Sequence, residues 1–300
     1  MTSSEGASET SVYDSITEAE DDTRWAFGTG FSDPLAGIDT SVPDGVAGAD
    51  LAAYSLMLGD DALVMSHRLQ QWCTNAPELE DEVALANIGL DLLGQARLLL
   101  ARAGSADGSG RGEDALAFGR DEHEFGNVRL AELENGDFGE LIARLLVFSV
   151  WRLALLARLT GSRDTVLAAL AAKGVKEVTY HRDYAAQWLI RLGDGTDFSR
   201  ERAQAGLTEI WPYVGELFGA GEVEERLAAA GVGVAPDELR EEFDQVMGQV
   251  LAAGGLAWPE ATPRSGVSGQ TGRDGVHTEA MGYLLAEMQS IARAHPGATW

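Results

Sequence analysis

From residue 50 onward, nearly the whole chain has the pattern of long helices joined by short polar loops. Apolar residues recur every three or four positions over stretches of twenty residues and more, and no hairpin or strand–helix–strand pattern interrupts them. Long helices in water gain most of their stability by packing their apolar faces together. The sequence therefore predicts an all-α fold, an antiparallel four-helix bundle with additional flanking helices.

The predicted helices divide into four that form the bundle and four that pack around it. The bundle helices are predicted at residues 50–73, 77–103, 138–160 and 164–192. The flanking helices are predicted at 113–134, 199–218, 236–253 and 277–293.

The second bundle helix carries a regular apolar stripe. Its members are spaced four, three, four and three residues apart, which is the spacing of a helix–helix packing seam. We expect this stripe to face the bundle core. Its residues are Leu79, Val83, Ala86, Leu90 and Leu93.

The charge balance excludes several classes of partner. The chain has 48 acidic and 22 basic residues, a formal net charge of −26, which opposes binding to nucleic acid and to anionic membrane surfaces. The apolar run Leu145–Leu159 contains Arg152 and Arg158 and is too short to span a bilayer. A polar N-terminus without a signal peptide and a single cysteine, Cys73, fit a reducing cytoplasm. We therefore expect a cytoplasmic protein with no nucleic acid and no membrane as partner.

The N-terminal segment differs from the rest of the chain. Residues 1–48 are rich in Ser, Thr, Gly, Asp and Glu, have one basic residue, Arg24, and show no lasting periodicity. This composition is typical of a disordered acidic tail. The sequence predicts a tail over residues 1–48 and one helical domain over 49–300.

Acidic residues on the bundle helices are the most informative feature for function. Asp60 and Asp61 lie on the first helix, Asp91 on the second, and Glu177 and His181 on the fourth. An ionised carboxylate without a partner costs several kcal/mol in a protein core. These side chains must therefore have partners, and metal ions are one kind of partner.

Di-iron carboxylate bundles use a Glu from each of two helices and a Glu-x-x-His pair from each of the other two. Here the pattern survives only in part. Three positions after Asp91 stands Gly94, three positions after Glu177 stands Tyr180, and the third helix offers Ser149 at its centre. The sequence favours a degenerate di-iron site that has become a salt-bridged polar core. Its possible cations are Arg97, Arg152 and Lys176.

A glycine-rich segment near the C-terminus carries Arg273 and His277, followed by Glu279 at the start of the last predicted helix. Such a loop could hold a phosphate, dock a partner or simply connect two helices. Because the chain is so acidic, we favour partner docking through these three residues.

Several long segments resemble a known family. They are YSLMLGDDALVMSHRLQQWC, APELEDEVALANIGLDLLGQARLLL, KEVTYHRDYAAQWLIRLGDGT, IWPYVGELF and GRDGVHTEAMGYLLAEMQSIARAHPGATW. Together they are similar to the C-type subunits of the ring-1,2-phenylacetyl-CoA epoxidases, the multicomponent oxygenases of aerobic phenylacetate breakdown. The resemblance covers about residues 50–300 and leaves the first 48 residues outside.

This resemblance implies a ferritin-like bundle that is itself non-catalytic. It implies that a homologous catalytic A subunit holds the di-iron centre and epoxidises phenylacetyl-CoA with O₂ and electrons from a reductase. The expected partners are that A subunit, the other subunits and the reductase. No catalytic, cofactor-binding or metal-binding residue is then expected in this chain.

Two alternatives stay open at this point. One is an active di-iron oxygenase with irregular ligands, for which Asp60, Asp91, Glu177 and His181 are candidates. The other is a helical binding module unrelated to oxygenases.

Overall fold

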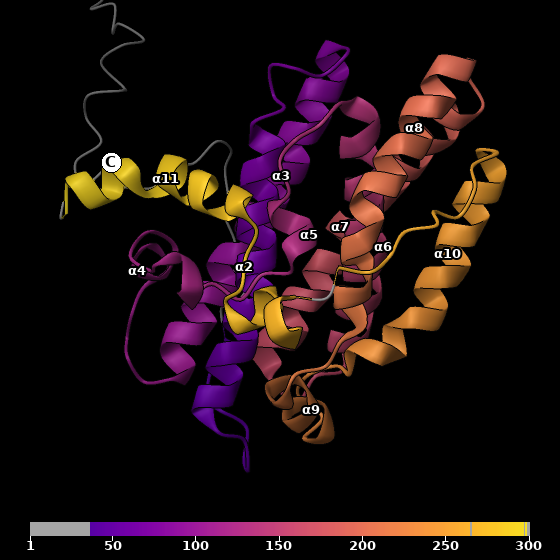
Figure 1. The fold of residues 1–300 in the computed structure, drawn as a ribbon. Helices are drawn as coiled ribbons and strands as arrows, with labels where there is room; N and C mark the ends of the chain where they lie inside the picture. Colours follow the sequence, from indigo (N-terminus) through magenta and orange to yellow (C-terminus); the bar gives the residue numbers. More distant parts are fainter. Residues whose placement is uncertain (1–36, 265, 297, 299–300) are drawn as a thin grey trace, which may run out of the picture. The chain divides into compact units, whose positions relative to one another are not determined.

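The computed structural model describes residues 37–264, 266–296 and 298, and every regular element within them is a helix (Figure 1). The prediction of an all-α bundle is confirmed. Its four long helices are α2 (Gly48–Gln70), α3 (Leu79–Ala106), α6 (Phe138–Leu159) and α7 (Thr165–Gly193).

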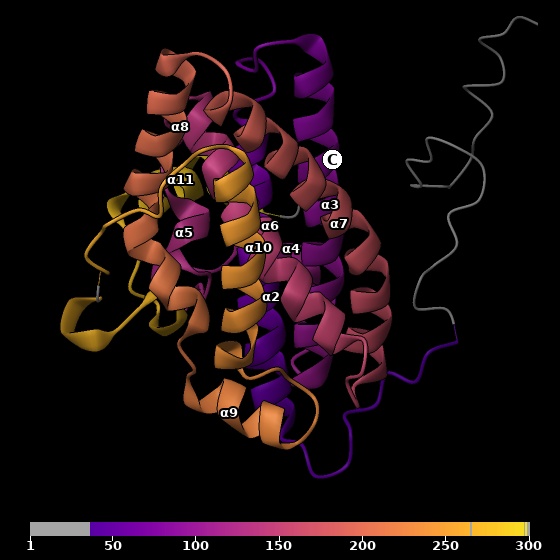
Figure 2. The ribbon, with the colours of Figure 1, turned by 90° about the vertical axis from the view of Figure 1, so that its right-hand side faces the viewer.

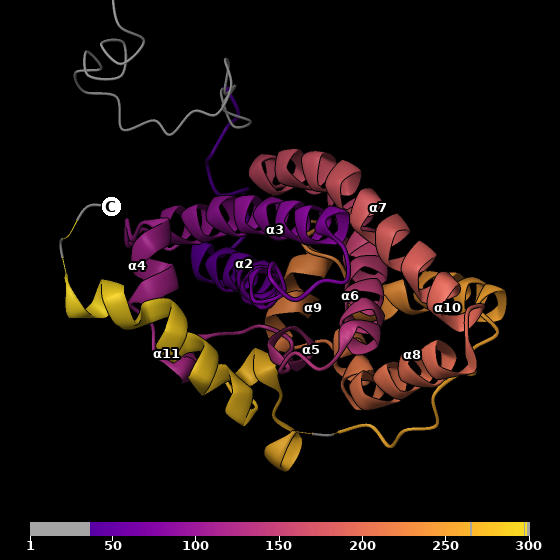
Figure 3. The same ribbon diagram turned by 90° about the horizontal axis from the view of Figure 1, so that it is seen from above.

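The long helices pack as two hairpins. α2 lies along α3 and α6 lies along α7, and the two hairpins meet where α3 contacts α7 (Figure 3). On the other side of α6, α8 (Asp197–Ile210) and α10 (Arg240–Ala253) cover the bundle (Figure 2). α7 is a continuous helix, and side chains of α3 contact it along the line where the two hairpins meet.

Short helices complete the described part of the chain. Two of the flanking helices predicted as continuous begin or end in a 3₁₀ turn, and α9 was not predicted. The remaining α-helices are α4 (Glu113–Phe118), α5 (Arg129–Glu132), α9 (Glu222–Ala229) and α11 (Glu279–Ala294). The 3₁₀ turns are η1 (Glu122–Glu124), η2 (Trp211–Phe218), η3 (Pro236–Leu239), η4 (Val267–Gly269) and η5 (Gly272–Asp274).

Two aspartates cap the N-termini of the two helices of the second hairpin. The Asp137 carboxylate accepts a hydrogen bond from the Glu140 amide at 3.0 Å and so caps α6. The Asp164 carboxylate accepts from the Leu167 amide at 2.9 Å and caps α7. Such caps satisfy backbone N–H groups that have no partner within the helix. Asp164 also forms a buried ion pair with Arg102 of α3, which ties the start of α7 to the first hairpin.

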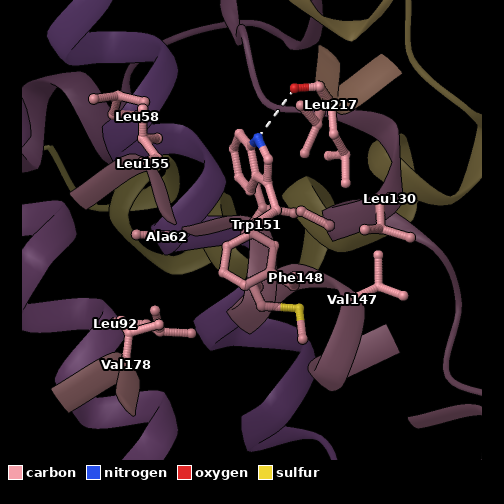
Figure 4. Packing of buried hydrophobic residues seen from close by; sticks show 14 of the residues in the cluster. Leu58, Ala62, Leu92, Leu130, Val147, Phe148, Trp151, Leu155, Val178 and Leu217 are labelled. Atoms are coloured by element: carbon pink, nitrogen blue, oxygen red, sulfur yellow. Dashed lines mark hydrogen bonds between the residues drawn. The ribbon is translucent and has the colours of Figure 1, made fainter. Parts of the chain in front are cut away.

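The core lies between the two hairpins. Trp151 of α6 is buried, and its indole nitrogen donates to the Leu217 carbonyl at 3.0 Å (Figure 4). Ala62 of α2, Leu92 of α3 and Val178 of α7 belong to the same buried cluster. All four long helices thus contribute apolar side chains to one core.

The prediction of one continuous helix over residues 113–134 is wrong. After α4 the chain leaves the helix, and the backbone amides of Gly126 and Val128 donate to the Asp60 and Asp61 carboxylates at 3.0 and 2.8 Å. Amides in a helix interior are already bonded within the helix and could not serve these carboxylates. Long-range hydrogen bonds, which local periodicity does not reveal, therefore determine this segment.

The predicted N-terminal tail ends earlier than residue 48. Residues 1–36 lie outside the described residues, so that part of the prediction is not addressed. From residue 37 the chain contacts the bundle: Arg102 donates to the Ser41 carbonyl at 3.2 Å, and Arg163 donates to the Asp44 carbonyl at 3.1 Å. The helical unit begins before α2.

The seam predicted on α3 faces the wrong way. Leu79, Val83 and Leu90 are 70, 53 and 57% exposed. Because α3 is apolar on nearly every side, its periodicity does not decide which side faces the core. The other two seam residues, Ala86 and Leu93, are partly buried. The residues of the buried face are instead Ala84, Leu85, Ile88, Leu92, Ala96 and Leu99.

The crossing of α6 and α8 depends on a glycine. A Cβ atom at Gly206 would lie 2.6 Å from the Glu140 Cα, whereas a Cβ atom at Gly94 of α3 would meet nothing within 4 Å. We therefore expect Gly206→Ala to lower the free energy of unfolding by about 1–3 kcal/mol through overpacking. The control Gly94→Ala should raise it by up to about 1 kcal/mol through helix propensity. Urea denaturation of both variants checks this, and equal shifts would contradict the crossing.

Candidate functional site: a charged core in place of a metal centre

The two adjacent carboxylates of α2 are both buried and both paired with arginine. The Asp60 carboxylate binds the Arg120 guanidinium through both oxygens. The Asp61 carboxylate accepts from the Arg273 guanidinium at 3.0 and 2.9 Å. Adding the amides of Gly126 and Val128, every oxygen of these two carboxylates has a partner.

The segment before α11 is tied to the bundle by a second buried pair. The His277 Nδ1 atom lies 2.7 Å from a Glu132 carboxylate oxygen, and its Nε2 atom lies 3.0 Å from the Phe125 carbonyl. Both side chains of the pair are fully buried. Burial alone would lower the pKa of His277, but the hydrogen bond and charge of Glu132 raise that pKa above its ordinary value.

A third arginine lies at the centre of the bundle. Arg152 of α6 is fully buried, and it donates to the Gln95 amide oxygen of α3 at 2.9 Å and to the Leu58 carbonyl of α2 at 3.3 Å. Burial lowers the pKa of Arg152 to about 10, so its guanidinium stays charged at neutral pH. Arg152 is therefore the cation at the centre of the bundle. The sequence alone offers three candidates for it, Arg97, Arg152 and Lys176.

Gln95 also contacts α7. Its amide nitrogen donates to the Glu177 carboxylate at 3.0 Å, and Lys173 lies 3.2 Å from the other Glu177 oxygen. One turn further along α7, the buried His181 Nε2 atom lies 3.0 Å from the Asp91 carboxylate, which is 39% exposed. The α3–α7 edge is thus a row of polar contacts that runs from the centre outward.

The row continues with aromatic residues. The Tyr184 hydroxyl and the Trp188 indole nitrogen both donate to the Asp81 carboxylate of α3, each at 2.9 Å. Glu177, His181, Tyr184 and Trp188 therefore face α3 together, as their spacing on one helix face predicts.

Of the three positions at which the sequence predicts lost ligands, two face outward and one is buried. A Cβ atom at Gly94 would point into open space, and Tyr180 is 54% exposed, so both face outward. Ser149 is buried on α6, and its hydroxyl has no hydrogen-bond partner among the described residues. Counting three positions from Asp91 and Glu177 therefore selects the outer faces of α3 and α7.

The i, i+3 pairs that do face inward were missed. On α3 they are Leu92 and Gln95, and on α7 they are Val178 and His181, all of them buried. Leu92 and Val178 would stand where the di-iron pattern asks for Glu, and Gln95 stands where it asks for His. Only the rotation of each helix, which the burial pattern supplies, identifies these positions.

The residues present do not fit a di-iron centre. Such a centre needs four carboxylates and two histidines around the bundle axis. Within the described ranges, no three His, Cys, Asp or Glu side chains gather closely enough to hold a metal ion. The inward positions carry Leu92 and Val178, and the guanidinium of Arg152 would repel a metal cation.

The three proposed docking residues differ in their exposure. The side chains of Arg273 and His277 are buried and bound to Asp61 and Glu132. Glu279, at the start of α11, is exposed. This placement argues against docking through Arg273 and His277, which instead hold the C-terminal segment on the bundle.

Comparisons with known proteins show the family to which the chain belongs. The family model of the phenylacetic acid catabolic proteins matches residues 39–300. The chain belongs to this family. A relative in Escherichia coli (strain K12), the C-type subunit of its 1,2-phenylacetyl-CoA epoxidase, is 45% identical over 251 residues, which are 83% of this chain and 99% of the relative. The family match begins close to residue 37, where the described part of the chain begins.

The buried position of Arg152 predicts a large effect of its removal. We expect Arg152→Met to lower the free energy of unfolding by about 3–5 kcal/mol, because the polar groups around it lose their cation in a dry core. The control is Arg158→Met on the same helix, whose pair with Glu242 is partly exposed and is worth less than about 1 kcal/mol. Urea denaturation measures both, and equal losses would contradict a buried cation at the bundle centre.

The raised pKa of His277 predicts a pH dependence of stability. Protonated His277 stabilises the fold fully below about pH 6.5, the value in the unfolded chain, and this contribution is lost as pH rises through the folded pKa. Denaturation between pH 6 and 9 should show this loss in the wild type and not in His277→Gln. His123→Gln, a control at an exposed histidine, should keep the pH dependence. An unchanged profile in His277→Gln would contradict the assignment.

Proposed function

We propose that this chain is a structural, non-catalytic subunit of a phenylacetyl-CoA epoxidase complex, in which a homologous A subunit performs the oxygenation. The observation that carries the proposal is the buried Arg152 guanidinium, which stands among four helices where an active bundle needs metal ligands. The similarity to the C-type subunit of an epoxidase, over nearly that protein's whole length, supports the assignment to such a complex.

The proposal gives the polar core a structural task. Arg152 touches α2 and α3 directly and reaches Glu177 of α7 through Gln95, so one cation holds the four long helices in register. A bundle locked in this way needs no metal for its geometry. It can present a fixed surface to a catalytic partner.

The partner would also supply most contacts to coenzyme A. The cofactor's phosphates are anionic, and this chain has a formal net charge of −26. Long-range repulsion therefore opposes binding of the free thioester by this chain alone. We assign the reductase contact and the di-iron centre to other subunits of the complex as well.

An active di-iron enzyme with irregular ligands is the competing function. Its candidate ligands are divided between two places: Asp60 is bound to Arg120 at one side of α2, whereas Asp91, Glu177 and His181 lie along the α3–α7 edge. No observation on the described residues favours this alternative.

Glu177→Gln separates the two functions. The substituted amide oxygen can still accept the Gln95 hydrogen bond, but the carboxylate that could bind iron is gone. We expect a complex co-expressed with the A-type subunit to keep its turnover of phenylacetyl-CoA, and its iron to remain with the A-type chain after the chains are separated. Loss of turnover in an intact complex, or iron on this chain, would contradict the proposal. Failure to form any complex would favour an unrelated binding module.

A further inference from the structure

An apolar stripe runs along the outer face of α3. We name Leu79, Val83, Ala86, Leu90 and Leu93 the α3 seam. Its three most exposed residues, Leu79, Val83 and Leu90, are each more than half exposed. Monomeric proteins rarely leave a continuous run of large apolar side chains in water, so such a run marks an interaction surface.

The surface continues onto α7. Tyr180 is 54% exposed and lies one turn from Glu177 and Tyr184, both of which contact α3. Gly94, one turn after Leu90, places no side chain on the same outer face. A gap of this kind lets another backbone approach closely. The α3 seam and Tyr180 therefore lie on the outer faces of two helices that contact each other.

The described part of the chain does not cover this surface with a helix. In Figure 3, α2 lies along one side of α3 and α7 crosses its other side, and the exposure of Leu79, Val83 and Leu90 shows that neither helix covers the seam. Among the described helices, α3 is long and apolar enough to cross a membrane by length and composition, yet only half of its most apolar window is buried.

The charges beside the seam identify the occupant's chemistry. At the Leu79 end, Glu78 and Glu80 are exposed and Glu82 is partly exposed. At the other end, the exposed Arg97 forms an ion pair with Glu113, and Lys173 forms one with Glu177. The two lysines of the whole chain, Lys173 and Lys176, both lie on the exposed side of α7 near that end. The surface is therefore acidic at the Leu79 end and carries charges of both signs at the Leu93 end.

Two other occupants fit these charges poorly. The acidic end repels an anionic lipid surface. A second copy of the chain would bring another formal net charge of −26 to the interface, and this long-range repulsion opposes self-association.

We propose that the α3 seam and Tyr180 dock a long amphipathic helix of another helical subunit of the complex. That helix would present an apolar stripe of the same four–three spacing, with Lys or Arg beside the Leu79 end. The proposal rests on the function proposed above, because it names the surface through which this chain supports its catalytic partner.

The central test is a charge placed in the middle of the seam. Full-length Leu90→Glu is co-expressed with the A-type subunit, and the affinity is measured with the purified chains. We expect a loss of at least about 30-fold, the effect of a residue worth 2 kcal/mol in an interface. The matched control is Phe198→Glu on α8, where the side chain is 73% exposed, and it should bind as the wild type does. Circular dichroism and thermal melting establish that both variants are folded.

The outcomes distinguish failure of the docking surface from failure of the proposed function. If the wild type binds no A-type subunit, the proposed function fails. If the wild type binds it and Leu90→Glu binds equally well, only the docking surface is wrong. If the wild-type chain alone is a dimer that Leu90→Glu makes monomeric, the occupant is a second copy and the proposal is overturned.

A charge reversal tests the proposed polarity. Glu80→Lys should weaken binding of the A-type subunit, and the effect should shrink as salt is added, because these charges are exposed and screened. Tighter binding by Glu80→Lys would place acidic residues of the partner at this end and would overturn the charge pattern that we assign to its helix.

Discussion

The arrangement of the bundle depends on the buried guanidinium of Arg152. Arg152 lies on α6 and connects the four long helices, by direct hydrogen bonds to α2 and α3 and through Gln95 to Glu177 of α7. A charge in a dry core is tolerated only when hydrogen bonds and opposite charges surround it. Once Arg152 is present, the polar residues of α3 and α7 must stay, and the four helices cannot slide independently.

The same principle organises the rest of the charged interior. On α2, Asp60 and Asp61 form ion pairs with Arg120 and Arg273 and accept hydrogen bonds from two loop amides. Segments distant in sequence are thereby held on the bundle by pairs that water does not reach. Among the described residues, the interior holds charged pairs between apolar side chains and no cluster of metal ligands. The carboxylates of α2, which suggest ligands in the sequence, act as anchors for the loop before α5 and the segment before α11.

Helix periodicity predicted the fold well, but not the direction in which each helix faces. The bounds of α6 and α7 follow closely from sequence, because both have capping aspartates and clear apolar periods. α3 is apolar nearly all round, so its exposed stripe was assigned to the core. The same error of rotation moved the expected histidine positions from Gln95 and His181 to the outer face, at Gly94 and Tyr180. Helix rotation depends on contacts between helices, which spacing along one helix does not contain.

The most direct test of the account is a crystal structure of the complete complex with anomalous diffraction recorded at the iron absorption edge. The account predicts no iron peak between α2, α3, α6 and α7 of this chain, and density for the Arg152 guanidinium in contact with Gln95. It also predicts an iron peak in the homologous A-type subunit. An iron peak in this chain beside Glu177 and His181, with Arg152 displaced from the centre, would contradict the account.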